Sequence, residues 1–262
     1  MTKFSLALIV FSQVVATGAV AQSAAEKGRQ IVLKSTDSSG GYKTSSASGE
    51  MALRSANGKV SKRRFYTKSI EGSGSEGTKS LLVFEWPGDI RNTGLLTHAR
   101  KNASDRQWLF LPSIRRVKKI SSSGRSGSFV GSEFSYQDMV DQDIDKFTYE
   151  WLEQSSCPGG GSCDVVDRYP KEKSGYTKQR MWIDTDESRH RQIQYFGKGS
   201  LHVKTLNISG YKKFKGRWWR AARLSMQNHQ TGKSTILTWK NRKFGISISS
   251  RDLSVSGLKR LK

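Results

Sequence analysis

Residues that bind metals or act in catalysis are scarce in this sequence. Its 262 residues include only two cysteines and four histidines. The histidines, His98, His190, His202 and His229, are scattered, and no His-Glu-x-x-His motif brings two of them onto one helix face. The sequence also lacks a Gly-x-Ser-x-Gly motif and a phosphate loop ending in Gly-Lys-Ser/Thr. A catalytic triad that assembles only in space leaves no such motif. These absences nevertheless predict a protein that is not an enzyme and has no cofactor or metal site.

Long apolar runs are also absent, apart from a short one at the N-terminus. Lys3 precedes a mostly apolar stretch over residues 4–15, which is too short to span a bilayer. Ala19, Val20 and Ala21 then provide the small residues of a cleavage site. We therefore interpret residues 1–21 as a secretory signal peptide cleaved near Ala21, and predict an exported, periplasmic protein that spans residues 22–262.

Acidic residues are few, with 22 Asp and Glu against 45 Lys and Arg, and the formal net charge is +23. Such a charge attracts anionic partners over a long range, although it also serves simply to keep a protein in solution. Residues 211–220 interleave basic and aromatic side chains, which suits either nucleic-acid bases or a membrane surface. An exported protein meets anionic lipids rather than nucleic acid. We therefore predict no nucleic-acid partner.

The two cysteines lie close together, since five residues, three of them glycine, separate Cys157 from Cys163. The exported compartment permits oxidation. The spacing is not that of a Cys-x-x-Cys redox pair, and a metal site would need two further ligands. We therefore predict a structural disulfide between Cys157 and Cys163.

Alternating apolar residues and frequent turn residues dominate the chain. A short helix is predicted over residues 24–35, with Ser23 as its N-cap, followed by a linker to residue 48. Beyond it, the pattern predicts an antiparallel meander or barrel rather than βαβ units, with a hairpin turn at Asn57 and Gly58. The predicted strands are residues 51–54, 60–70, 80–86, 94–100, 106–111, 115–120, 165–169, 176–184, 191–196, 201–211, 217–228 and 233–239. We expect a helix and linker over 22–48 and a single β domain over 49–262.

A second helix is predicted over residues 136–152, with an acidic cluster near its start. The cluster consists of Asp138, Asp141, Asp143 and Asp145 and contains an Asp-x-Asp-x-Asp sequence. A calcium-binding loop needs Gly at its sixth position and Glu at its twelfth. Counted from Asp141, these positions hold Lys146 and Leu152. We therefore expect these aspartates to stabilise the start of the helix, or to pair with basic residues of the strands, rather than to bind calcium.

Twelve apolar residues of the predicted strands are candidates for one concave, lipid-binding face. Such residues usually fill an ordinary core. However, apolar residues make up only 35% of the chain, which is little for a large closed interior, and a half-open sheet around a cavity needs fewer. The candidates are Met51, Leu53, Phe84, Trp86, Trp108, Phe110, Met181, Ile183, Ile193, Tyr195, Leu224 and Met226.

The most informative stretch is residues 108–139. It reads Trp-Leu-Phe-Leu-Pro-Ser-Ile-Arg-Arg-Val-Lys-Lys-Ile over 108–120, then a Ser/Gly loop over 121–128, and Gly-Ser-Phe-Val-Gly-Ser-Glu-Phe-Ser-Tyr-Gln-Asp over 127–138. This pattern resembles the LolA-like outer-membrane lipoprotein-sorting proteins. Weaker matches follow at residues 181–184 and 219–226, so that the resemblance covers residues 24–239.

The resemblance implies a mainly β fold, a curved, incomplete antiparallel β-barrel (LolA/LolB-like) with a few helices as a lid on its concave side. It also implies a periplasmic carrier that shields acyl chains of lipids or lipoproteins between membranes, associates with a membrane transporter and has no catalytic residues. Arg115, Arg116, Lys118 and Lys119 would form a basic rim that meets anionic head groups or an acidic partner. The alternative is a basic, exported protein that binds polyanions or membrane surfaces without a cavity.

Overall fold

The computed structural model describes residues 22–74, 76–101 and 103–261, and the predicted signal peptide, residues 1–21, lies outside the described residues. Its helices and strands are, in chain order, α1 (Ala24–Ser39), β1 (Thr44–Arg54), β2 (Val60–Ile70), β3 (Glu76–Trp86), β4 (Gly94–Arg100), β5 (Arg106–Leu111), β6 (Arg116–Lys119), β7 (Phe147–Ser156), β8 (Ser162–Pro170), β9 (Lys178–Asp184), β10 (His190–Phe196), β11 (His202–Ser209), β12 (Lys212–Phe214), β13 (Trp218–Arg220), β14 (Arg223–Asn228), β15 (Ser234–Phe244) and α2 (Val255–Leu258). Short 3-10 helices are η1 (Pro112–Ile114), η2 (Ser123–Ser126), η3 (Tyr136–Met139), η4 (Ile144–Lys146) and η5 (Lys198–Ser200). None of the helices in the described part is long and apolar enough to cross a membrane.

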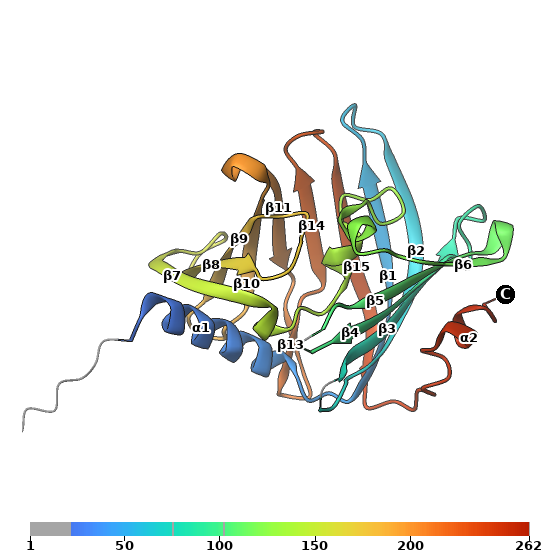
Figure 1. Cartoon of the computed structure of the whole chain (residues 1–262), viewed down its shortest axis with the longest axis horizontal. Coiled ribbons are helices and arrows are strands. Elements are labelled where there is room, and N and C mark those ends of the chain that lie inside the picture. The colour runs from blue at the N-terminus through green and yellow to red at the C-terminus, as the bar shows by residue number, and fades with distance from the viewer. Residues whose placement is uncertain (1–21, 75, 102, 262) are drawn as a thin grey trace, which may run out of the picture.

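Thirteen of the strands form one antiparallel sheet, in the order β6-β5-β4-β3-β2-β1-β15-β14-β11-β10-β9-β8-β7, and β12 and β13 form a separate hairpin. The large sheet curls around a concave face without closing, since β6 and β7 are its two edges (Figure 1). β1 pairs with β15 along most of its length and so joins the N-terminal strands to the C-terminal ones. The predicted mainly β, curved and incomplete antiparallel barrel is confirmed.

The connection between β6 and β7 crosses the concave face. These two strands follow one another in the chain but lie at opposite edges of the sheet, so residues 120–146, which we call the crossover segment, must span the open side (Figure 1). Phe129 and Phe134 of this segment are buried, at 0% and 2% exposure. A backbone hydrogen bond from Phe129 N to Phe134 O closes a tight loop that presents both rings to the sheet.

An inner cluster of apolar side chains joins the sheet to the crossover segment. Phe65 and Phe84 lie edge to face on neighbouring strands, and Phe84 stacks on Phe129. Because successive side chains of a strand point to opposite faces, every second residue contributes to this cluster. Its most deeply buried members are Met51, Phe65, Phe84, Phe129, Val166, Met181, Ile183, Met226 and Leu237.

A second, outer cluster lies on the opposite face of β3, β4 and β5. The chain after β15 returns along this face and places Leu253 and Leu258 on it. The backbone oxygen of Leu253 also bonds His98 Nε2 at 2.8 Å. The buried members of the outer cluster are Leu81, Val83, Leu96, Phe110, Leu253 and Leu258.

Two predicted elements are wrong. Residues 136–152 do not form a helix, because Phe147 and Tyr149 alternate with exposed Thr148 and Glu150 in β7, and aromatic residues with this period favour a strand. The residues before β7, which include the acidic cluster, form the two short 3-10 helices η3 and η4 instead. The linker is also shorter than predicted, since α1 continues to Ser39 and β1 begins at Thr44, where it pairs with both β2 and β15.

The disulfide between Cys157 and Cys163 is formed, with a Cα–Cα distance of 5.0 Å. It closes the hairpin between β7 and β8. Gly159, Gly160 and Gly161 all have positive φ in this turn, a conformation that glycine adopts without a steric cost. The three glycines between the cysteines therefore allow the tight turn that brings the sulfur atoms together.

Candidate functional site

The concave face is filled at one end and hollow at the other. At the filled end, the inner cluster occupies the space between the sheet and the crossover segment. At the other end, small polar residues lie side by side on β1 to β4, where Ser45 pairs with Ser69, Ser69 with Ser80, and Ser80 with Thr97. Because these side chains are short, a cavity of about 810 Å³ remains above them, which we call the large cavity.

The lid of the large cavity comes from α1 and the crossover segment. The C-terminal half of α1 contributes Val32 and the last turn of the helix, and the crossover segment contributes Met139, Val140 and Ile144. Gly28 allows α1 to lie close to the edge strand, since a Cβ atom there would come within 2.8 Å of the Trp151 backbone nitrogen. Packing of α1 against the edge strand β7 thus fixes one side of the lid.

The walls of the large cavity are mixed in character. An apolar track crosses the sheet from β15 to β10 through Trp239, Leu224, Ile208 and Ile193, and Ile208 pairs directly with Leu224. On β3 and β4, further apolar residues of the wall include Leu82 and Leu95. Five arginines also line the cavity, Arg100, Arg168, Arg189, Arg220 and Arg242, as do four acidic residues, Asp37, Glu71, Asp141 and Asp143.

A β-bulge places Arg242 on the inner face. The β1–β15 register shifts between Ser46 and Ser48, and Asn241 has φ of 51°. Trp239 faces inward, so regular alternation would turn Asn241 inward and Arg242 outward. The bulge inserts one extra residue into β15. Side chains beyond it therefore point to the face opposite to the one that regular alternation would give, and Arg242 points inward.

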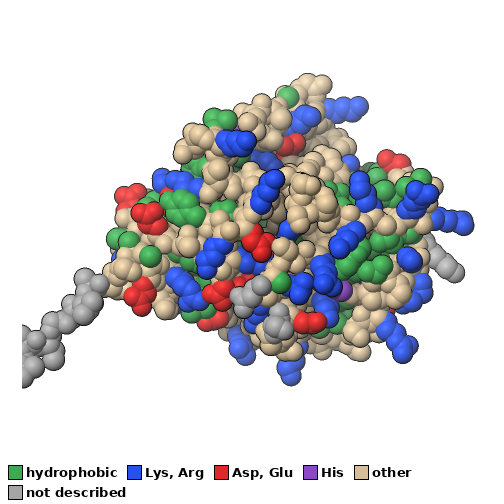
Figure 2. All heavy atoms as spheres, viewed as in Figure 1, with side chains coloured by type: hydrophobic (Ala, Val, Ile, Leu, Met, Phe, Trp, Pro, Cys, Tyr) green, Lys and Arg blue, Asp and Glu red, His purple; other side chains and the backbone are tan. Residues whose placement is uncertain are grey.

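Arg168, Arg220 and Arg242 are not paired with carboxylates, since every salt bridge among the described residues involves other basic side chains. Burial lowers the pKa of Arg168 and of Arg220, and burial together with the charge of Arg220 lowers the pKa of Arg242 to about 10. On the face of the molecule that Figure 2 shows, Lys and Arg side chains are widespread and Asp and Glu side chains are fewer. The cavity is therefore suited to a ligand that has both apolar and anionic parts.

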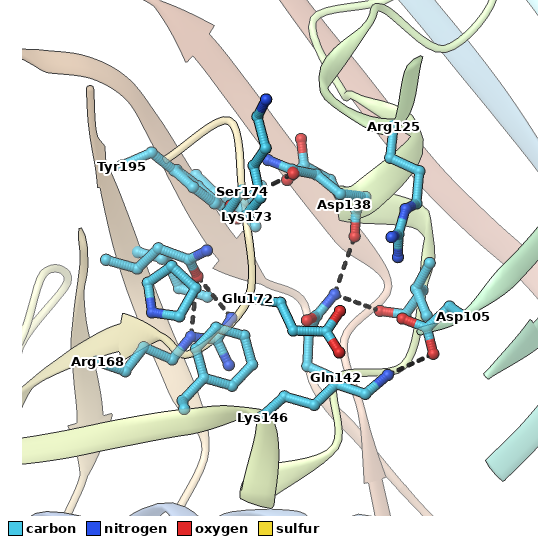
Figure 3. Close-up of a pocket in the computed structure, with 17 residues that line it drawn as sticks. Asp105, Arg125, Asp138, Gln142, Lys146, Arg168, Glu172, Lys173, Ser174 and Tyr195 are labelled. Atoms are coloured by element: carbon cyan, nitrogen blue, oxygen red, sulfur yellow. Dashed lines mark hydrogen bonds and ion pairs between the residues drawn. The ribbon is translucent and has the colours of Figure 1, made fainter. Parts of the chain in front are cut away.

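A smaller recess of about 210 Å³ adjoins the large cavity at Arg168 and Ile193, which line both. In this recess the Arg168 side chain lies against Phe147, with Cζ 4.4 Å from the ring centroid, and its Nε donates to Gln179 Oε1 at 2.9 Å (Figure 3). Asp138 lies across the recess and is half-buried, and the loss of solvent around its carboxyl group raises its pKa. The recess has both apolar and charged residues in its lining, and with about a quarter of the volume of the large cavity it offers less room for an acyl chain.

The acidic cluster does not converge on one point. Asp138 accepts hydrogen bonds from Ser135 and from Tyr176, Asp143 accepts one from the Asp145 backbone at the start of η4, and Asp145 pairs with Arg29 of α1. No group of three or more potential metal-binding side chains occurs in the part of the chain that the structure describes. The carboxylates thus order the crossover segment.

Nine of the twelve predicted lipid-binding residues lie in or against the inner cluster: Met51, Leu53, Phe84, Met181, Ile183, Ile193, Tyr195, Leu224 and Met226. Most of them pack in its solid part. Ile193 and Leu224 line the large cavity, and Tyr195 lines the smaller recess. The sequence therefore indicated the correct face for these residues, but not which of them border empty space.

Trp86, Trp108 and Phe110 do not face the concave side, contrary to the prediction. The β2–β3 register shifts at Glu85, so that Trp86 pairs with Arg64 and is 44% exposed. Trp108 and Phe110 belong to the outer cluster with Leu253. Their apolar surface is covered by the C-terminal segment, which the strand pattern of β5 alone does not reveal.

Sequence reasoning also missed several residues of the large cavity. Leu82, Leu95, Ile208 and Trp239 lie in strands that were predicted, and their period-2 positions were the available signal. These residues share one cavity because strands distant in the sequence pair with one another. No single segment of the sequence reveals that pairing.

The predicted basic rim lies on and beside the edge strand β6. Arg115, Arg116, Lys118 and Lys119 are all exposed, and no salt bridge to a described carboxylate involves them. Charged residues on an edge strand also prevent pairing with other chains. The four residues form a continuous cationic border on one edge of the sheet.

Comparison with known proteins places this architecture in a family. A family model described as that of an uncharacterized protein matches residues 76–260. No curated protein matches the chain. Among solved structures, an outer membrane lipoprotein-sorting protein domain from Vibrio parahaemolyticus is 36% identical with a TM-score of 0.87, covering 90% of this chain and 100% of that one.

Two further structures share the fold at lower identity. A DUF1329 family protein from Desulfovibrio piger is 24% identical with a TM-score of 0.85, covering 90% of this chain and 100% of that one. A LolA superfamily protein from Nitrosomonas europaea is 14% identical with a TM-score of 0.69, covering 89% and 98%. The sequence identity to the Vibrio domain shows that the chain belongs to the same family of outer membrane lipoprotein-sorting proteins, and its fold is LolA-like.

Proposed function

We propose that this protein is a periplasmic carrier that binds acyl chains of lipids or lipoproteins in the large cavity and transfers them between membranes. The observation that carries the proposal is the cavity itself, which lies between the curved sheet and its lid. The likeness to a lipoprotein-sorting domain supports the same function. A carrier of this kind needs no catalytic group.

The size and lining of the large cavity suit an acyl chain. Its volume of about 810 Å³ falls within the range of roughly 300–1,000 Å³ that is typical of small-molecule sites. The track formed by Trp239, Leu224, Ile208 and Ile193 offers apolar surface along the sheet. Each methylene group moved from water to such a surface contributes about 0.8 kcal/mol. A chain of moderate length thus gains enough free energy to bind.

The basic rim is the proposed membrane-facing part of the carrier. Arg115, Arg116, Lys118 and Lys119 are exposed on one edge of the sheet. Near an anionic membrane, each such charge contributes about 1 kcal/mol of attraction. We further propose that this edge also docks on an acidic surface of a membrane transporter. Export through the signal peptide would bring the chain to the compartment where these partners lie.

The competing hypothesis is a protein that binds polyanions or membrane surfaces through its charge alone and has no cavity. The large cavity favours the carrier over this hypothesis. Mass spectrometry of lipids extracted from the purified protein distinguishes the two. Co-purifying acyl lipid is the result expected for a carrier. Absence of lipid, combined with salt-sensitive binding of polyanions, would support the competing hypothesis.

A further inference from the structure

Arg220 and Arg242 both line the large cavity, near enough for the charge of one to act on the other, and most of their hydrogen-bonding capacity is unused. A guanidinium group has five N–H donors. Arg242 makes a single long bond, from Nη2 to Ala221 O at 3.4 Å. Arg220 donates to two backbone oxygens, those of Trp219 and Ser39. Several donors of this pair are therefore free to bind a ligand.

Aromatic rings hold the two guanidinium groups in place. Arg220 Cζ lies 4.8 Å from the centroid of Tyr42 and 5.5 Å from that of Phe244, and Arg242 Cζ lies 5.8 Å from that of Trp239. Stacking of this kind fixes the plane of a guanidinium group and leaves its N–H edge available. The pair is thus positioned before any ligand arrives.

The charges around the pair leave it without a counter-ion. Asp141 of the crossover segment and Glu71 are the carboxylates whose charge acts on Arg220, yet neither forms a salt bridge with it among the described residues. Glu71 is already occupied, since its two oxygens accept from the backbone nitrogens of Gly41 and Lys43. Two neighbouring, partly buried cations are costly unless an anion lies between them.

We propose that Arg220 and Arg242 form the head-group site of the large cavity, and that its ligand is an amphiphile with a carboxylate or phosphate head. The head binds between the two guanidinium groups, and the tail follows the apolar track from Trp239 toward Ile193. This inference rests on the proposed function, since it requires that the cavity holds an acyl chain. It adds that the two arginines select the ligand by the negative charge of its head group.

The test compares two ligands that differ only in charge. Dodecanoate and dodecanamide share one chain, and their binding to the purified protein is measured by isothermal titration calorimetry. Because charge-assisted hydrogen bonds are about twice as strong as neutral ones, dodecanoate should bind at least about tenfold more tightly. The variant Arg242→Gln should lose this preference and still bind dodecanamide within about twofold of the wild type.

The control is Arg223→Gln, which removes the same charge from an exposed position on β14. It should keep the preference for dodecanoate. Arg220→Lys, which retains the charge but loses the planar fork, should reduce the preference in part. Unchanged binding of dodecanamide shows that a variant is folded.

The outcomes separate the inference from the proposed function. Binding of both ligands with equal affinity, or a preference that survives Arg242→Gln, overturns the head-group site and leaves the carrier intact. Displacement of dodecanoate by acetate or inorganic phosphate at the same concentration shows a site for small anions and also overturns it. Binding of neither ligand overturns both proposals.

Discussion

Phe84 and Phe129 stack with their ring centroids 5.8 Å apart and their planes inclined by 22°. Phe84 belongs to β3 and Phe129 to the crossover segment, so this contact fastens the lid to the sheet at β3. Both side chains are 0% exposed. The stack therefore marks the solid end of the concave face, and the large cavity begins beyond it.

Replacement of Phe129 by alanine should destabilise the fold, because it leaves a void between the lid and the sheet. Truncation of a buried phenylalanine typically lowers the free energy of unfolding by about 3–5 kcal/mol. Urea denaturation measures the change. Ile114→Ala serves as the control, since Ile114 is 57% exposed and its loss should cost less than about 0.5 kcal/mol. Equal effects of the two substitutions would show that the crossover segment does not pack as described.

Loss of the disulfide should weaken the fold modestly. The bond joins cysteines six positions apart, and closing so short a loop restricts the unfolded chain by about 2 kcal/mol. The double variant Cys157→Ser, Cys163→Ser should show this loss in urea denaturation, and dithiothreitol should produce the same shift in the wild type only. A reductant that changes neither protein would indicate that the bond is absent in solution.

Stability should decline as the pH falls from 6.5 to 4, in part through His190. Burial, and then the nearby charge of Arg168, lower the pKa of His190 to about 4, although Asp184 opposes this. Between that value and the ordinary pKa of about 6.5 the unfolded chain binds the proton and the folded chain does not. Acidification therefore favours the unfolded state, by at most roughly 3 kcal/mol at this residue.

The variant His190→Gln isolates this effect, because glutamine stays neutral over the whole range. Free energies of unfolding are measured at several pH values between 7 and 4. The wild type should lose more stability than the variant over this interval. Parallel curves for the two proteins would mean that His190 takes up its proton equally in both states.

Local patterns in the sequence were sufficient to locate most strands. The turn that contains Asn57 and Gly58 connects β1 and β2, and Gly58 has φ of 86°, a conformation that glycine adopts without a steric cost. The predicted strands at 60–70, 94–100 and 106–111 agree with β2, β4 and β5. Alternation and turn residues are local properties, so a single segment reveals them.

The features that build the site are not local. Glu85 and Asn241 lie at irregularities of strand pairing, and these decide that Trp86 points outward and Arg242 inward. Neither position differs visibly from an ordinary strand residue in the sequence. Phe110 likewise has the pattern of a cavity residue, yet the C-terminal segment covers it. Which residues border the cavity depends on pairings and coverings contributed by distant parts of the chain.

If the large cavity holds an acyl chain, a bulky side chain that fills the cavity should prevent binding. Ile208 of β11 lines the cavity, whereas Asn207 beside it is exposed. We would compare Ile208→Trp with the control Asn207→Trp, measuring the molar ratio of a bound fluorescent fatty acid at saturation. We expect near-stoichiometric binding by the wild type and by Asn207→Trp, and little binding by Ile208→Trp. Equal binding by both variants would show that the acyl chain lies outside the large cavity.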